Sequence, residues 1–169
     1  MQIHTDRLFI RNMTAEDWRS NQAIIQDFNQ SNFHIYDMPL PEENDKVKAL
    51  TGHWANSGLF FSVFLANTSE MIGYVCVHHD NGSYDLGYCF HSAYHGKGYA
   101  FESCTALMHY LAQTRDVTSF TASTALENTP SCHLLEHLGF TLQKTEQISF
   151  HKDSNGSDIF FHGGSFIKN

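Results

Sequence analysis

Two glycines near the middle of the chain stand where a backbone could bind an anion. Gly96 and Gly98 lie within His95–Ala100, between an apolar stretch and residues with helical spacing. Because glycine has no side chain, N–H groups at such a turn can face a phosphate, and the helix dipole adds about half a positive charge. The segment lacks both the P-loop and the Rossmann glycine patterns. The sequence predicts either a pyrophosphate site of another kind or a glycine-rich turn without a ligand.

A second pattern has the spacing of a metal site. His133, Glu136 and His137 form H-x-x-E-H, which places two imidazoles one helical turn apart with a carboxylate that could activate water. The helix would be only about two turns long, and the chain contains 12 His, so a chance match is easy. We keep a zinc hydrolase as a remote alternative and expect no metal.

Composition and charge exclude several classes of protein. The 169 residues suit a single domain over residues 1–169. Ten Lys and Arg against 18 Asp and Glu give a net charge of −8, whereas binding along a nucleic-acid backbone requires positive charge. The longest apolar run, Leu59–Ala66, is far shorter than the ~20 residues that span a bilayer. We therefore expect neither a nucleic-acid partner nor a membrane partner.

The expected compartment is the cytoplasm. The N-terminus shows no cationic leader followed by an apolar stretch, so no secretory signal is visible. The four cysteines are scattered without a C-x-x-C pair, which is typical of reduced, mostly buried thiols.

The hydrophobic pattern predicts an α/β (α+β) fold: a mixed, mostly antiparallel sheet with helices inserted along the chain. Asn81-Gly82 and Asn155-Gly156 are hairpin signals. The expected helices begin at Thr14, at Pro41 (ending at Gly58), near Ala100 and at Asn128 (ending at Gly139). The expected strands are Arg7–Asn12, Leu59–Leu65, Met71–His78, Tyr84–Phe90, Phe120–Ser123, Phe140–His151 and Asp158–Ile167.

Three segments resemble one known family in the right order. Leu86–Ser103, which contains HGKGYA, looks like the acetyl-CoA-binding segment of the GNAT N-acetyltransferase superfamily. Glu127–Phe140, ENTPSCHLLEHLGF, resembles its second CoA segment. The opening Thr5–Trp18, TDRLFIRNMTAEDW, is similar to the branch that includes ribosomal-protein N-terminal acetyltransferases. Together the segments cover essentially the whole chain.

The resemblance implies a fold and a set of cosubstrate contacts. The fourth and fifth predicted strands would splay apart, and the pantetheine arm of acetyl-CoA would pair with the backbone near Cys89 and Phe90. Asn128 would bond the pantetheine arm, and Ser131 would approach the thioester sulfur. His95 stands where the family usually has Gln or Arg, from which we expect weakened CoA affinity at worst. The pyrophosphate would be held by the N–H groups of His95, Gly96, Lys97, Gly98, Tyr99 and Ala100.

The chemistry of an amine and a thioester requires three groups. A base must remove the ammonium proton, backbone N–H groups must stabilise an oxyanion, and a donor must help the thiolate to leave. Many relatives carry a donor Tyr where this chain has Leu135. Ser131 is the substitute that the resemblance favours, against a hydroxyl that only bonds its own backbone.

The base has several candidates. Asp85 matches a position at which some superfamily members carry a catalytic Glu, but it could equally be a solvated residue beside a turn. Other members place a Glu where this chain has Ser123. His78, His91 and His151 could also serve, because imidazoles titrate near neutral pH.

The expected function is acetyl transfer from acetyl-CoA to a primary amine, by direct attack in a ternary complex. The acceptor would be a protein N-terminus or a small cationic amine, and the protein would be a monomer or a homodimer. The alternative is a non-catalytic acyl-CoA-binding or sensor module, which Leu135 and the uncertain base would suit.

Overall fold

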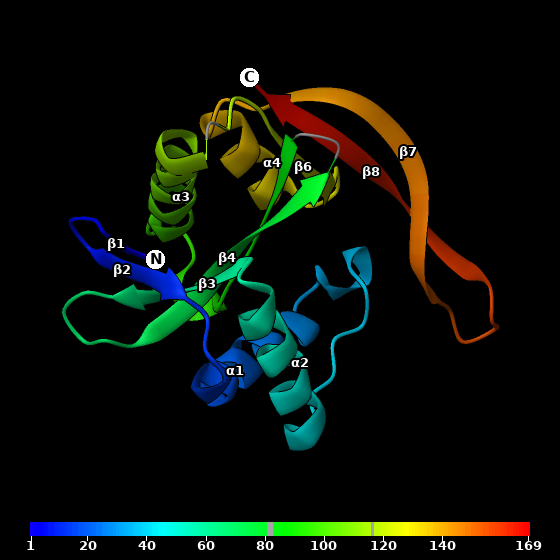
Figure 1. Cartoon of the computed structure of the whole chain (residues 1–169). Coiled ribbons are helices and arrows are strands. Elements are labelled where there is room, and N and C mark those ends of the chain that lie inside the picture. The colour runs from blue at the N-terminus through cyan, green and yellow to red at the C-terminus, as the bar shows by residue number, and fades with distance from the viewer. Residues whose placement is uncertain (81–82, 116) are drawn as a thin grey trace.

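Eight strands form one sheet in the computed structural model, which describes residues 1–80, 83–115 and 117–169 (Figure 1). The strand order is β1-β2-β3-β4-β5-β6-β8-β7, and neighbours are antiparallel except for β5 and β6. The mostly antiparallel sheet that the sequence predicts is confirmed. The strands are β1 Gln2–His4, β2 Leu8–Asn12, β3 Phe60–Leu65, β4 Met71–Asp80, β5 Ser83–Phe90, β6 Phe120–Ala125, β7 Thr141–Lys152 and β8 Asp158–Lys168.

Helices cover both faces of this sheet (Figure 1). Helices α3 and α4 pack on one face over the larger core, in which Val63, Val75 and Leu107 are fully buried. On the other face, α1 and α2 enclose a smaller core around Ile24, Phe60 and Tyr74. None of the described helices is both long and apolar enough to cross a membrane. The helices are α1 Trp18–Asn29, α2 Asn44–Ser57, α3 Tyr99–Arg115 and α4 Thr129–His137, with short 3-10 turns at Ala15–Asp17, His34–Tyr36 and Ser92–Tyr94.

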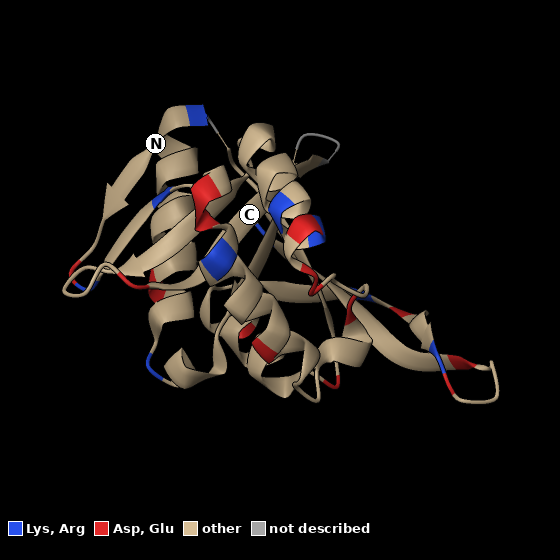
Figure 2. Cartoon of the chain, turned by 90° about the horizontal axis from the view of Figure 1, so that it is seen from below, with Lys and Arg blue, Asp and Glu red and all other residues tan. Residues whose placement is uncertain are grey.

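The hairpin of β7 and β8 extends beyond the body of the sheet (Figure 1). Its turn contains Gly156 at φ +83°, which confirms the second hairpin signal. Two ion pairs, Lys144–Glu146 and Lys152–Asp158, both at 2.9 Å, lie along this hairpin. Figure 2 shows its basic and acidic segments close together toward the tip.

Two sequence-based expectations differ from the structure. A short strand, β1, precedes the first one expected, so the predicted fourth and fifth strands are β5 and β6. Helix α2 begins at Asn44 rather than at Pro41, because its N-cap Glu43 is extended and side chains of α1 bind carbonyl groups of the segment before it. Gln22 Nε2 donates to the Glu42 carbonyl at 2.7 Å, and Asn29 Nδ2 donates to the Leu40 carbonyl at 3.1 Å. The hairpin signal at residues 81–82 lies outside the described residues.

Asp17 ties the first helical turn to two strands. Its buried carboxylate accepts two hydrogen bonds from the Arg11 guanidinium, at 2.6 and 2.8 Å. It also accepts from the Thr14 N–H and from the Ser62 hydroxyl, each at 2.9 Å. Burial alone would raise the pKa of Asp17, but these hydrogen bonds outweigh it and hold the pKa below its ordinary value.

Replacing Asp17 is expected to destabilise the fold. Asp17→Asn leaves Arg11 without its charged partner, and we expect the free energy of unfolding at pH 7 to fall by about 3 kcal/mol. The wild-type carboxylate stabilises the fold above its unfolded pKa of about 4, and this contribution is lost as pH falls through the lower folded pKa. Urea unfolding of both proteins between pH 3 and pH 7 measures the difference between their free energies of unfolding, which should become smaller as the pH falls.

The matched control for this prediction is Asp45→Asn. The Asp45 side chain is 99% exposed and lies 3.6 Å from Lys48, so its loss is expected to change stability little. Equal stability of the Asp17 and Asp45 variants would contradict the role assigned to Asp17.

Candidate active site

A cleft opens where β5 and β6 separate. The two strands pair at only two positions, Tyr84 with Phe120 and Asp85 with Thr121. Beyond them, β5 continues along β4 as far as Phe90, while β6 follows β8. The facing edges of the two strands therefore line a cavity of about 820 Å³. Its walls include Leu86–Phe90 of β5, Ala122–Ala125 of β6, the N-terminus of α3 and the first turns of α4. The predicted splay of these strands is confirmed.

The glycine turn lies at one end of this cleft. Gly96 and Gly98 have φ of +71° and +80°, which glycine adopts at little cost. The N–H groups of Gly98 to Phe101 donate to no residue in the described ranges, as is normal for a first helical turn. The His95 ring lies toward the end of β5, where its Nε2 is 2.7 Å from the Phe90 carbonyl oxygen. This turn has the donors and shape to bind an anion.

An ion-pair network that the sequence analysis missed holds the turn in place. Arg7 donates to the Lys97 carbonyl at 2.9 Å and to the Glu102 carboxylate at 2.7 Å. Thr5 donates to the same carboxylate at 2.5 Å. Burial opposes ionisation of Glu102, but the hydrogen bonds from Thr5 and Arg7 outweigh it and hold its pKa below the ordinary value. The loop between β1 and β2 is thereby joined to the first turn of α3.

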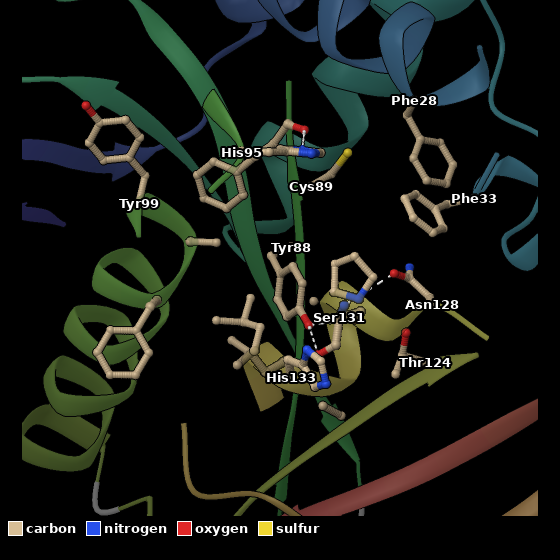
Figure 3. A pocket seen from close by; sticks show the side chains of 18 of the residues that line it. Phe28, Phe33, Tyr88, Cys89, His95, Tyr99, Thr124, Asn128, Ser131 and His133 are labelled. Atoms are coloured by element: carbon tan, nitrogen blue, oxygen red, sulfur yellow. Dashed lines mark hydrogen bonds between the residues drawn. The ribbon is translucent and has the colours of Figure 1, made fainter. Parts of the chain in front are cut away.

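Helix α4 brings two polar residues to the opposite wall. Asn128 caps the helix, since its Oδ1 accepts from the Ser131 N–H at 3.3 Å. The Ser131 hydroxyl lies 2.7 Å from the Tyr88 hydroxyl of β5, and both side chains line the cleft (Figure 3). Leu135, one turn further, is 1% exposed and lies in the core. Tyr88 is a second residue that the sequence analysis missed.

The expected bases lie away from the cleft lining. Asp85 stands at the paired end of the splay, where its carboxylate accepts from the Thr121 hydroxyl at 3.0 Å. His78 packs edge-on against Phe60, and His91 lies 3.8 Å from Asp27. His151 Nε2 lies 2.8 Å from the Asp37 carbonyl. Ser123, where other family members carry a Glu, does line the cleft.

The segment between α1 and α2 contributes a further wall. Phe28 at the end of α1 and Phe33, Tyr36 and Asp37 of this segment line the cleft, although nothing in the sequence marked them as functional residues. Tyr36 and Asp37 also line an adjoining cavity of about 210 Å³, together with Glu146, Phe150 and Phe161 among others. Aromatic residues and Asp37 thus belong to the walls of the cleft, and Glu146 adds a second acidic residue in the adjoining cavity.

The zinc-hydrolase alternative gains no support from the arrangement of side chains. His133 and His137 line the cleft. In the ranges that the structure describes, however, no group of three or more His, Cys, Asp or Glu side chains is arranged to hold a metal ion.

Comparison with known proteins identifies the class. The model of the acetyltransferase (GNAT) domain matches residues 7–141, so the chain belongs to the GNAT acetyltransferase family. It is an acetyl-CoA-dependent N-acetyltransferase.

Individual relatives agree with this assignment. The chain is 28% identical to the uncharacterized N-acetyltransferase YnaD of Bacillus subtilis, over 82% of each sequence. It is 27% identical to the ribosomal protein uS5-alanine N-acetyltransferase of Escherichia coli, over 83% of this chain and 78% of that one. The structure of RimL, a ribosomal L7/L12 α-N-protein acetyltransferase solved with coenzyme A, shares the fold. Its TM-score is 0.76 at 17% identity, covering 98% of this chain and 97% of RimL.

We predict that Gly98→Val weakens coenzyme A binding at least about tenfold, which corresponds to ~1.4 kcal/mol. Gly98 has φ +80°, and a Cβ there would lie 3.3 Å from Arg7 Nη2, so the side chain would disturb both the turn and the residue that holds it. Titration calorimetry with coenzyme A measures the affinity.

Gly156→Val is the matched control, because Gly156 has φ +83° and lies in the β7–β8 hairpin, outside the cleft lining. It is expected to carry similar backbone strain without losing affinity. Unchanged affinity in a folded Gly98→Val protein would show that this turn does not bind the cosubstrate.

Proposed function

We propose that the protein transfers the acetyl group of acetyl-CoA directly to a primary amine, in a complex that holds both substrates. The observation that supports this most is the cleft between β5 and β6, which opens onto the N–H groups at the start of α3. In the balanced reaction the amine nitrogen bonds to the acetyl carbon and the carbon–sulfur bond breaks. The ammonium group loses two protons in all, of which one is released and the other balances the proton that the departing thiolate takes up to form coenzyme A. Acetyl-CoA supplies the activated acyl group, and the chain supplies positioning and hydrogen bonds.

The pyrophosphate of acetyl-CoA would be held by the glycine turn. Its binding residues would be Gly96, Lys97, Gly98, Tyr99 and Ala100, mainly through backbone N–H groups and the dipole of α3. The N–H of His95, which the sequence also assigned to the pyrophosphate, instead donates to the Ser92 carbonyl at 3.0 Å. Since the His95 ring lies against the Phe90 carbonyl, we assign it the task of joining the turn to β5. This contact offers a reason why His is accepted where the family usually has Gln or Arg.

The pantetheine arm would lie along β5, beyond its last pair with β6. Cys89 and Phe90 line the cleft there, and the open edge of β5 near them would pair with the arm as with a neighbouring strand. Asn128 uses its oxygen to cap α4, while its amide nitrogen donates to no residue in the described part of the chain. That nitrogen would donate to the arm, and Ser131 would approach the thioester sulfur.

The acceptor would be a cationic amine. The adjoining cavity joins the cleft at Tyr36 and Asp37 and also contains Glu146, so two carboxylates could attract a protonated amine. Both a small amine and a protein N-terminus carry this charge. The named activity of the Escherichia coli relative supports a protein N-terminus.

Asp85 is proposed as the base that receives the ammonium proton, through water. The carboxylate is oriented by the Thr121 hydroxyl and stands where β5 and β6 begin to diverge. Because Asp85 is not among the residues that line the cleft, it would receive the proton through a water molecule rather than by direct contact with the amine.

Acetyl-CoA is expected to bind and to be consumed. The melting temperature should rise with acetyl-CoA concentration, as mass action requires for a ligand of the folded state. Thiol release should follow with at least one of spermidine, glucosamine or an alanine-initiated peptide. An unchanged melting temperature together with no binding heat at millimolar acetyl-CoA would refute the proposal. Binding without turnover of any amine would instead support the acyl-CoA-binding module.

We expect Asp85→Asn to lower kcat/KM most at acidic and neutral pH. Activity should partly return as the pH rises through the pKa of the acceptor, about 8 for a peptide N-terminus or about 10 for an alkylamine, because the amine then loses its proton unaided. Asn retains an oxygen for the Thr121 hydroxyl, so the fold should survive. The pH–rate profile is compared with that of Asp158→Asn, a change on the distant hairpin. Identical profiles would remove Asp85 from the mechanism.

A further inference from the structure

The contact between Tyr88 and Ser131 joins the two walls of the cleft. Tyr88 lies on β5 and Ser131 in the first turn of α4, 43 residues later. Their hydroxyl oxygens are 2.7 Å apart, a normal length for a strong O–H···O bond. The Tyr88 hydroxyl is also 3.4 Å from the Ser131 carbonyl, which is too long to compete. Figure 3 shows the two side chains pointing toward each other inside the pocket.

The direction of this hydrogen bond matters for the chemistry. Burial raises the pKa of Tyr88 above its ordinary value, so the phenol keeps its proton at neutral pH. A neutral phenol can donate to the Ser131 oxygen. Ser131 has a single proton, and when its oxygen accepts from Tyr88, that proton is free to point elsewhere.

We propose that Tyr88 is a positioning residue. It does not contact the substrate, but it orients the Ser131 hydroxyl so that the Ser131 proton faces the departing thiolate. The inference rests on the proposed function, in which Ser131 approaches the thioester sulfur. A residue of β5 would thus support the donation of a proton toward the thiolate. Leu135 of α4 cannot do so, because its side chain is apolar and buried in the protein core.

The pKa values of the two groups indicate whether Tyr88 and Ser131 donate only a hydrogen bond or transfer a full proton. A thiol has a pKa of about 8.5, and a tyrosine has a pKa of about 10, which burial of Tyr88 raises further. Moving a proton from Tyr88 through Ser131 to the thiolate would thus be uphill. The pair stabilises the developing negative charge by donation alone, and the thiolate obtains its proton afterwards from solvent.

The test is a double-mutant cycle with Tyr88→Phe, Ser131→Ala and the combined variant. Tyr88→Phe removes one hydroxyl and keeps the ring in place. The matched control is Tyr84→Phe, on the same strand and the same face, but outside the cleft lining. Each protein is assayed for kcat and KM with acetyl-CoA and the best acceptor among spermidine, glucosamine and the alanine-initiated peptide. Calorimetry gives the acetyl-CoA affinity, and thermal unfolding checks the fold.

We expect Ser131→Ala to lower kcat by roughly ten- to a hundredfold and Tyr88→Phe by roughly three- to tenfold, with acetyl-CoA affinity and melting temperature near those of Tyr84→Phe. In the Ser131→Ala background, removing the Tyr88 hydroxyl should have no further effect on kcat, because it acts through Ser131. A purely structural role would instead change affinity or stability and would be additive.

The outcomes separate the inference from the function on which it rests. An active wild-type protein with unchanged kcat in Tyr88→Phe overturns the inference alone. Additive losses in the double variant also overturn it, since Tyr88 would then act independently of Ser131. A wild-type protein that releases no thiol with any of the three amines overturns both.

Discussion

The short parallel pairing of β5 and β6 is the constraint on which the site depends. Each strand is held on its other side, β5 by eight positions along β4 and β6 by six along β8. The two strands can therefore diverge after Asp85 and Thr121 without losing their places in the sheet. Unpaired main-chain groups are costly when they are buried away from water. An open edge of this kind is maintained because it faces a cleft, in which a bound molecule can complete the pairing.

Long-range polar contacts fix the groups that surround this opening. Arg7 and Thr5 donate hydrogen bonds to Glu102, so the glycine turn is positioned by the loop between β1 and β2, about ninety residues earlier. The His95 ring joins the same turn to the end of β5. On the opposite wall, Asn128 caps α4 and Tyr88 meets Ser131. The groups that we propose to bind and to react are thus held from two sides, which reduces the loss of conformational freedom that catalysis would otherwise require.

The end of α1 and the α1–α2 segment give the cleft a lining different from that of the glycine turn. Phe28, Phe33, Tyr36 and Asp37 line it together with the N-terminus of α3. Backbone donors at a helix N-terminus favour an anion, whereas a carboxylate favours a cation. Both preferences suit the proposed reaction between an anionic cosubstrate and a cationic acceptor.

The sequence by itself determined the features that depend on neighbouring residues. The buried face of α3 follows from apolar residues at helical spacing, and Asn128 from the preferences of a helix N-cap. The conformations of Gly96 and Gly98 are likewise local. Motifs in these segments sufficed to indicate the family, and with it the splayed strands.

Only the tertiary structure decided which distant residues meet. The Tyr88–Ser131 and Arg7–Glu102 contacts span 43 and 95 residues, and no local pattern records such pairs. The start of α2 was misplaced because side chains of α1 bind the carbonyls of Leu40 and Glu42 and the N-cap Glu43 is extended, against the preference of Pro41 for a first helical turn. Asp37 likewise lies in a segment without a motif and reaches the cleft only because the chain folds back there. In each case the topology brings the partners together, and single-residue preferences contain no information about it.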